Sequence, residues 1–332
     1  MSLKSTMEIR KCEGCGITLQ YSDDSKVGFI PKNKFKEGAI YCQRCFKLKN
    51  YNEKVYNDSL IVDEGLIDKV NATNNYAFFL IDFLNINDES INTFKQIKLN
   101  KTLVISKCDL IFKDINLERV KDNLRKSYDI KDNIIFLSSK KNQNINQIFT
   151  TLDKNNLKTT FILGYTNAGK STLINCLKGN KERIIASSMP NTTLDFIEIK
   201  IGDYKIIDTP GFSLKTTFNK KQEFELIKKL NPVYFVSPIN YQIKEEQIFS
   251  IEDRLYLKNF GNNSATFYMS NMIKIKKIYK DEIDNYKEIN VNEDNDVVIA
   301  SLGFIHVKKK CTIKVNEEYY NLISVRDSIL KK

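Results

Sequence analysis

The chain has 332 residues, enough for two or three domains that each bury a hydrophobic core. No apolar run approaches the roughly 20 residues that span a bilayer, and the N-terminus lacks the apolar stretch of a secretory signal, so we expect a cytoplasmic protein without a membrane partner. The net charge of +11 favours an anionic partner such as RNA, although a basic surface without a dedicated partner explains it equally well.

Residues 1–56 contain two cysteine pairs, Cys12 with Cys15 and Cys42 with Cys45. Two thiolates three positions apart can bind one ion from a tight turn, and two such turns complete a tetrahedron. Because this segment has no histidine, four thiolates would close the site, which is typical of structural zinc; an iron–sulfur cluster or a redox pair is the alternative. We predict a zinc-binding module here. Its 11 Lys and Arg against 6 Asp and Glu make it the better candidate for an RNA contact.

From residue 57 to residue 215, short apolar runs alternate with helical patterns, which predicts a mainly parallel sheet with helices on both faces. The predicted strands are 76–82, 102–106, 133–138, 159–164, 196–201 and 204–208, and the predicted helices are 117–128, 144–153 and 170–177. Residues 216–332 follow a different sequence pattern, which predicts an amphipathic helix at 220–230 and then mixed structure that ends in a β-meander. We expect an α+β C-terminal domain there.

The stretch GYTNAGKST, residues 164–172, lies between a predicted strand and a predicted helix and matches the phosphate-binding loop GxxxxGK[ST]. Gly164 and Gly169 let backbone N–H groups turn inward around the β-phosphate. Lys170 would reach the β and γ oxygens, and the Ser171 hydroxyl could bind Mg²⁺. A structural glycine turn before a helix is the alternative. The remaining predicted contacts of this loop with the nucleotide are Asn167, Ala168 and Thr172.

Asp208 ends a predicted strand and begins the tetrapeptide DTPG. This position suits an indirect contact with Mg²⁺, and the Gly211 N–H could then read the γ-phosphate. The loop MPNTTLDF lies between the two phosphate motifs. We predict that Thr193 in this loop closes over Mg²⁺ when the γ-phosphate is present, although an ordinary surface loop is the alternative.

A Ras-type GTPase has its base-recognition motifs after DTPG, but residues 212–332 contain none. Two candidates lie upstream instead, each at the end of a predicted strand: SKCD at 106–109 and SSK at 138–140. Asp109 would accept hydrogen bonds from guanine N1–H and from the 2-amino group, a pair of donors that adenine lacks. Lys107 would lie along the base, and the guanine carbonyl would meet the backbone of Ser138, Ser139 and Lys140.

With base motifs before phosphate motifs, the sequence resembles a circularly permuted GTPase, and the cysteine pairs in CEGCG and CQRC narrow this to the YqeH family of ribosome-assembly GTPases. The resemblance covers the whole chain and is most specific at the cysteines, GYTNAGKST, PNTTLD and DTPG. It implies a zinc module, a permuted Ras-like domain and a C-terminal domain that binds RNA or protein. It further implies a monomeric bacterial protein that hydrolyses GTP slowly during assembly of the small ribosomal subunit, with rRNA or the pre-ribosomal particle as partner.

Three residues depart from the expected patterns or refine them. Ser106 replaces the Asn usual in the family, which predicts the loss of an amide that braces the phosphate loop and contacts the base. Phe212 replaces the Gln that orients water in Ras-type enzymes, which predicts slow hydrolysis. In related enzymes an Asn at the position of Asn167 coordinates K⁺, which predicts potassium-stimulated hydrolysis; an Asn that only shapes the loop, and activation by the ribosomal particle, are the alternatives.

Two other functions compete with a GTPase switch. One is a zinc-stapled RNA-binding protein with a vestigial nucleotide site, and the other is an ATP-dependent kinase or ATPase. Because DTPG runs almost directly into the C-terminal segment, we also expect the nucleotide state to reorient residues 216–332. RNA contact and an ordinary surface explain equally well the lysines and aromatic residues of that segment, which are Phe267, Tyr268, Lys274, Lys276, Lys277, Tyr279, Lys280, Tyr286 and Lys308–Lys310.

Overall fold

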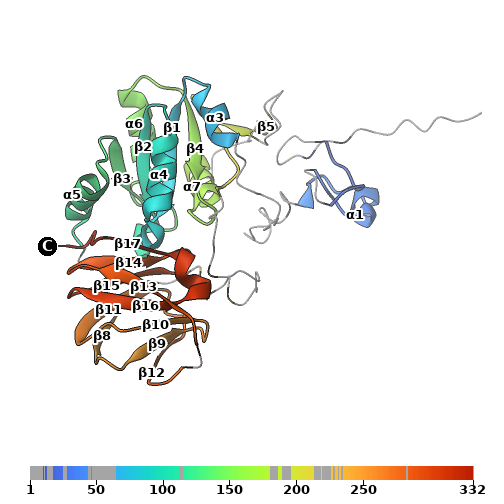
Figure 1. Ribbon diagram of the computed structural model, residues 1–332. Coiled ribbons are helices and arrows are strands. Elements are labelled where there is room, and N and C mark those ends of the chain that lie inside the picture. Colours follow the sequence, from blue (N-terminus) through green and yellow to red (C-terminus); the bar gives the residue numbers. More distant parts are fainter. Residues whose placement is uncertain are drawn as a thin grey trace, which may run out of the picture.

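The computed structural model has an α/β body and a β body in contact with each other, together with a short N-terminal segment (Figure 1). The α/β body comprises the described residues between 65 and 212, and the β body those between 235 and 331. The residues that the structure describes are 10, 12, 18–24, 28–43, 46, 65–111, 115–179, 186–188 (backbone only), 196–212, 218, 226, 229–230, 232, 235–281 and 283–331.

The α/β body is built on a seven-stranded sheet with the order β3-β2-β1-β4-β7-β6-β5. The strands from β3 to β7 in this order are parallel, and the hairpin of β6 and β7 and the short edge strand β5 add antiparallel pairs. The strands are β1 (Tyr76–Asp82), β2 (Lys101–Ser106), β3 (Asn133–Phe136), β4 (Thr159–Gly164), β5 (Ala186–Ser188), β6 (Ile197–Ile201) and β7 (Tyr204–Asp208).

One helix precedes the first strand of the sheet, and the others follow strands β1, β2, β3 and β4 in turn. They are α3 (Leu66–Asn71), α4 (Asp88–Gln96), α5 (Leu117–Tyr128), α6 (Gln147–Lys154) and α7 (Lys170–Lys178), with short 3-10 turns η1 (Phe83–Asn85) and η2 (Cys108–Leu110). Strand β1 is buried at every position, as expected for a parallel strand covered on both faces. The predicted mainly parallel sheet is therefore confirmed, and each of its six predicted strands is present with small shifts at the ends.

The β body contains two five-stranded antiparallel sheets, ordered β12-β9-β10-β16-β13 and β17-β14-β15-β11-β8. In β11 every second residue is buried, so one face of the strand lines the core. The elements are β8 (Ile239–Ile243), β9 (Ile248–Ile251), β10 (Leu255–Lys258), β11 (Asn263–Met269), β12 (Ile275–Ile278), β13 (Tyr286–Val291), β14 (Asn295–Ile299), β15 (Gly303–Val307), β16 (Cys311–Asn316), the 3-10 helix η3 (Glu317–Leu322) and β17 (Ile323–Asp327).

The predicted C-terminal β-meander is wrong. Strands β14 and β15 form a hairpin, but β16 leaves it and pairs with β10 and β13 in the other sheet, and β17 returns to pair with β14. Local apolar patterns located these strands correctly but carry no information on which sheet each one joins. Of the predicted helix at 220–230, the structure describes only residues 226, 229 and 230, all in helical conformation.

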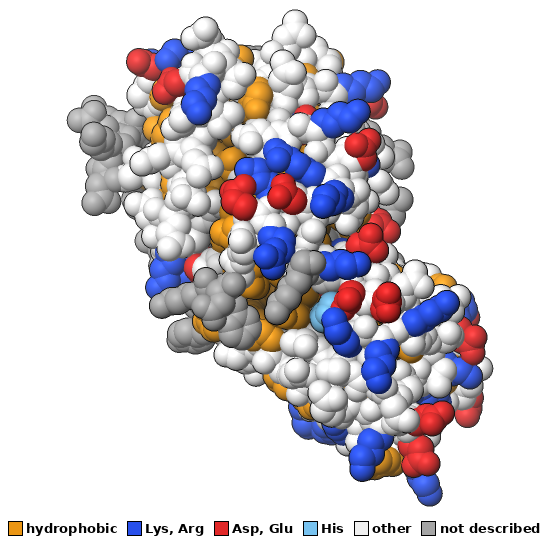
Figure 2. All heavy atoms as spheres, turned by 90° about the vertical axis from the view of Figure 1, so that its left-hand side faces the viewer, with side chains coloured by type: hydrophobic (Ala, Val, Ile, Leu, Met, Phe, Trp, Pro, Cys, Tyr) orange, Lys and Arg blue, Asp and Glu red, His pale blue; other side chains and the backbone are white. Residues whose placement is uncertain are grey.

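One hydrophobic cluster extends across both bodies. Val236, Val298, Phe304 and Ile329 of the β body belong to the same buried cluster as the central strands of the α/β body. Figure 2 shows hydrophobic side chains gathered where the two bodies meet, on a face where acidic and basic side chains are otherwise mixed. Among the helices that the structure describes, none is both long enough and apolar enough to cross a bilayer.

Candidate nucleotide-binding site

The carboxyl ends of five parallel strands meet at one edge of the α/β sheet. The strand register aligns Asp82 with Ser106, and Leu80 with Gly164. It also aligns Ile162 with Asp208, so the phosphate motifs and the upstream base motifs follow the ends of adjacent strands. In open α/β sheets this edge is where ligands bind. The chain order of the motifs is therefore permuted, but their order in space is that of one continuous site.

The phosphate loop has the backbone conformation that its sequence predicts. Gly169 has φ +92° and Asn167 has φ +65°, a region favoured by glycine and tolerated by asparagine. At Gly164, with φ +141°, a Cβ atom would lie 2.3 Å from the carbonyl oxygen of Leu80, so only glycine allows β4 to pass β1 here. The Lys170 side chain is buried, and its Nζ donates to the carbonyl oxygens of Gly164 (2.7 Å) and Tyr165 (3.1 Å).

The DTPG segment closes directly against the phosphate loop. The Thr166 N–H donates to the Phe212 carbonyl (2.8 Å), and the Phe212 N–H donates to the Gly164 carbonyl (3.1 Å). A Cβ atom on Gly211 would lie 2.8 Å from Lys170 Nζ, so this glycine backbone approaches the loop lysine closely. A peptide N–H that adjoins this lysine is suitably placed to sense a γ-phosphate.

The Phe212 ring lies in the core rather than in the site. The side chain is 2% exposed and packs against Phe79 and Tyr165, with ring centroids 5.7 and 5.9 Å away. Tyr165 in turn shares a 2.7 Å hydrogen bond with the Thr93 hydroxyl, and burial raises the pKa of its phenol to about 12. The residue that follows DTPG thus anchors the loop and is not directed at a nucleotide.

The predicted guanine motif, SKCD at 106–109, is fixed by hydrogen bonds to its neighbours. The Ser138 hydroxyl donates to Asp109 Oδ1 at 2.6 Å, which leaves the second carboxylate oxygen for a ligand. Lys107 adopts a left-handed backbone conformation (φ 59°) at the start of η2. Burial raises the pKa of the adjacent Cys108 thiol to about 12, so this thiol stays neutral. The two upstream motifs are therefore in contact with each other.

Ser106 corrects one sequence-based expectation. The loss of the family's Asn predicted a lost brace on the phosphate loop, but the Ser106 hydroxyl donates to the Ala168 carbonyl at 2.6 Å. Both residues are 2% exposed, so the bond is shielded from water. A direct link between the base motif and the phosphate loop is thus retained with a shorter side chain.

Asp82 is a site residue that the sequence motifs did not reveal. Its Oδ2 accepts from Lys107 Nζ at 3.0 Å, and its Oδ1 accepts from the Leu84 N–H at 2.9 Å, which caps η1. Asn85 Nδ2 also donates to Oδ2, at 2.9 Å. The only available signal was the position of an aspartate at the end of a buried strand beside the two motif strands.

The predicted site residues divide into those at this sheet edge and those outside the described chain. The motif segments at the edge contain Lys107, Asp109, Ser138, Ser139, Lys140, Gly164, Asn167, Ala168, Gly169, Lys170, Ser171, Thr172, Asp208 and Gly211. The structure does not describe Thr193, Cys15 or Cys45.

Two of the four predicted zinc ligands lie together. Cys12 and Cys42 are 1% and 2% exposed, and the Cys42 N–H donates to the Cys12 sulfur at 3.1 Å. Such a bond favours the thiolate form that a metal requires. Within the described residues no three metal-binding side chains cluster, and the two remaining cysteines are outside that set.

The lysines and aromatic residues of the β body lie in different environments. Lys274 and Lys276 form ion pairs with Asp253 (3.5 and 2.6 Å). Phe267 is buried in the core, whereas Tyr279 is 64% exposed. Ion pairing accounts for Lys274 and Lys276 and core packing for Phe267, and an RNA contact by this segment stays a prediction.

The similarity of this chain to known proteins also favours a nucleotide-binding site. Residues 159–266 match the family model described as "50S ribosome-binding GTPase". The YqeH protein of Bacillus subtilis (strain 168), described as uncharacterized, is 27% identical over 91% of this chain and 93% of its own. A probable GTP-binding protein EngB of Mycoplasma capricolum is 27% identical over 45% of this chain and 81% of its own.

Among solved structures, YjeQ from Thermotoga maritima aligns with a TM-score of 0.30 and 22% identity, over 42% of this chain and 49% of that one, which is too little to bear on the fold. The YqeH match extends over nearly the whole of both chains, and the sheet joins upstream guanine motifs to a downstream phosphate loop. This similarity and the permuted order of the motifs both support the predicted resemblance to the YqeH family of circularly permuted GTPases.

Proposed function

We propose that this chain binds GTP and GDP and hydrolyses GTP slowly, as a nucleotide-dependent switch in assembly of the small ribosomal subunit. The observation that carries the nucleotide part is the 2.6 Å bond from Ser106, in the base motif, to Ala168, in the phosphate loop. It ties the two halves of the site together across 62 residues of chain. Asp109, held by Ser138, then reads the base while Lys170 and the loop N–H groups hold the phosphates.

Mg²⁺ is the expected companion of the phosphates. In this proposal the Ser171 hydroxyl, at the start of α7, and Thr193 bind the ion, and Asp208 at the end of β7 acts through its hydration shell. Gly211 senses the γ-phosphate through its N–H. Asn167, at φ +65°, holds K⁺ beside the phosphates, and this ion compensates for the absence of a water-orienting Gln at position 212.

Structural zinc is proposed for the N-terminal segment, held by Cys12, Cys15, Cys42 and Cys45. The fit rests on the buried, hydrogen-bonded pair of Cys12 and Cys42. The described core of this segment consists of those two cysteines with Leu19 and Ile30, beside the short helix α1 (Lys32–Lys36). So small a core needs a staple such as a metal ion to hold a fold.

The domain assignment that we propose is a zinc module at 1–56, a permuted GTPase domain at 57–215 and a C-terminal domain at 216–332. A ribosomal partner is supported by the net charge of +11, by its excess in residues 1–56 and by the ribosome-binding description of the matching family model. The zinc module is the proposed rRNA contact, and the protein acts as a monomer in the cytoplasm.

Nucleotide binding by the phosphate loop can be tested by titration. Titration of the protein with labelled GDP should show binding that GTP displaces and ATP does not, and Lys170→Ala should abolish it because the β-phosphate loses its cation. With a GTP analogue, the wild type should co-sediment with small ribosomal subunits. Equal GDP affinity in wild type and Lys170→Ala would indicate a vestigial site, and co-sedimentation that is independent of nucleotide would contradict a switch.

A further inference from the structure

The β body touches the α/β body beside the guanine motifs. The Val236 N–H donates to the carbonyl of Leu110, the residue after Asp109, at 2.9 Å. On α5, which follows the same motif, Asn123 Nδ2 donates to the carbonyls of Ile329 (3.2 Å) and Lys331 (3.0 Å). These contacts all reach the base side of the nucleotide site.

A further buried contact is made by Arg326 on β17. Its side chain is 2% exposed, its Nε donates to Asp296 Oδ2 at 3.3 Å, and its guanidinium lies 4.9 Å from the centre of the Phe304 ring. Its Nη1 crosses into the α/β body and donates to the carbonyl of Ile86, between η1 and α4. A buried cation is costly unless it is paired and hydrogen-bonded, so this side chain has little freedom to move.

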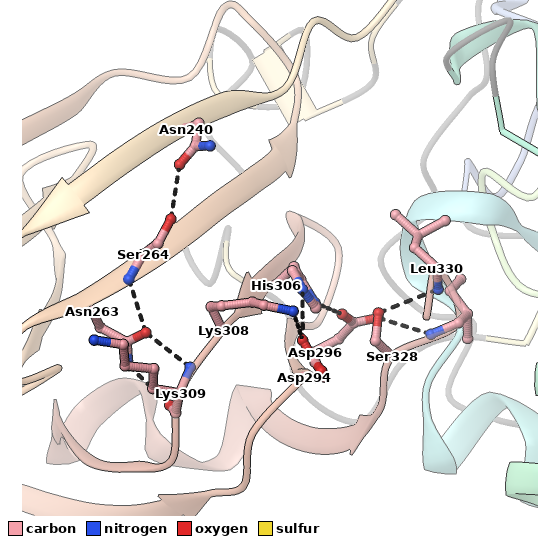
Figure 3. Close-up of polar contacts among 11 residues, drawn as sticks. Asn240, Asn263, Ser264, Asp294, Asp296, His306, Lys308, Lys309, Ser328 and Leu330 are labelled. Atoms are coloured by element: carbon pink, nitrogen blue, oxygen red, sulfur yellow. Dashed lines mark hydrogen bonds and ion pairs between the residues drawn. The ribbon is translucent and has the colours of Figure 1, made fainter. Parts of the chain in front are cut away.

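Asp296 is itself held on several sides. It is fully buried, its Oδ1 lies 3.1 Å from His306 Nδ1, and its Oδ2 accepts from the Ile329 N–H at 3.3 Å. Figure 3 shows the carboxylate between the His306 ring and the C-terminal residues. The pair of Asp296 and Arg326 is thus a fixed support on the β-body side.

From Ile86 a short path leads to the base motif. Ile86 directly follows η1, and Asp82 directly precedes it. The Asp82 carboxylate caps the turn and binds Lys107 Nζ at 3.0 Å. Strand β15, which carries Phe304, also lies against η1. The turn that positions Asp82 is therefore supported from the β body.

We infer that Arg326 is a positioning residue for guanine recognition: through Ile86 and η1 it sets Asp82, and through Asp82 it sets Lys107 beside Asp109. This rests on the proposed function, since it concerns the same nucleotide site. Through Arg326 the β body takes part in base selectivity. The coupling is reciprocal, so guanine nucleotide also stabilises the contact between the two bodies.

The test compares GDP with inosine diphosphate (IDP), which lacks the 2-amino group that Asp109 would accept from. Replacing Arg326 alone would leave Asp296 buried and unpaired. The variant is therefore Arg326→Met with Asp296→Asn, which keeps an acceptor for the Ile329 N–H. Lys314→Met is the matched control, because Lys314 pairs with Glu288 in the other sheet of the β body. Thermal unfolding verifies that each variant is folded.

Wild type and Lys314→Met should prefer GDP over IDP, and the double variant should lose about fivefold or more of that preference. A loss confined to GDP is not expected of a purely structural role, which would weaken both nucleotides alike. An unchanged preference in the double variant would overturn the inference and leave the proposed function intact. A wild type that binds GDP and IDP equally would overturn the inference alone, and a wild type that binds neither nucleotide would overturn the proposed function as well.

Discussion

At the scale of single residues, the site is held by short polar contacts around the sheet edge. The Ser106 hydroxyl replaces an expected amide, and the Asp82 carboxylate holds Lys107. The motifs predicted Lys107, Asp109 and Lys170, because each belongs to a short pattern with a known chemical role. They did not predict Asp82, whose partners come from another strand and become neighbours only in the folded sheet.

Ser106→Ala tests the brace on the phosphate loop. It removes one buried hydrogen bond, and a bond of this kind contributes about 1 kcal/mol, so GDP affinity should fall by roughly fivefold. Calorimetric titration measures the change.

Thr160→Ala is the matched control for this variant. The Thr160 hydroxyl also donates to a buried carbonyl, that of Tyr76 at 3.0 Å, but at the opposite end of β4. It should lower the unfolding temperature and leave the affinity unchanged. If Ser106→Ala bound GDP as tightly as wild type, the brace would have no role in binding.

At the scale of elements, DTPG is fixed to the phosphate loop by two backbone hydrogen bonds and by the buried Phe212 ring. This arrangement explains why a Gln at position 212 would not act as it does in Ras-type enzymes, since the side chain would enter the core. Phe212→Gln should therefore leave GTP hydrolysis no faster than in wild type. Burying an unpaired amide should also destabilise the fold, by about 1–3 kcal/mol.

Single-turnover hydrolysis and thermal unfolding check this prediction, with Phe212→Leu as the apolar control. The leucine variant should unfold at a temperature closer to that of wild type. A tenfold faster hydrolysis in Phe212→Gln, by about 1.4 kcal/mol of barrier, would mean that the side chain leaves the core and reaches the nucleotide.

Sequence patterns predicted the strands of the α/β body better than the strand pairing of the β body. Strands β1, β2, β3 and β4 read as continuous apolar runs, because both faces of a parallel sheet are covered. In the β body, strands such as β12 and β13 are partly exposed, and their apolar signal is weak. The pairing of β16 across to β10 depends on contacts between distant residues, so the meander inferred from chain order was wrong.

At the scale of the whole molecule, the β body is linked to both sides of the nucleotide site. Phe218, the next described residue after Phe212, packs in the β-body core against Tyr319, and its N–H donates to the Ser301 hydroxyl at 3.2 Å. The chain thus leads from the phosphate side into the β body, while Arg326 and Val236 contact the base side. Reorientation of residues 216–332 with nucleotide state remains a prediction.

We propose that the base motif, although it precedes the phosphate loop in the chain, serves that same loop. Asp109→Asn tests it, because xanthine has a carbonyl where guanine has its 2-amino group, and an asparagine amide can donate to that carbonyl. Wild type should prefer GDP to xanthosine diphosphate, and the variant should reverse this preference through a loss of GDP affinity of roughly 10- to 100-fold. An unchanged preference for GDP in a folded variant would contradict the permuted site.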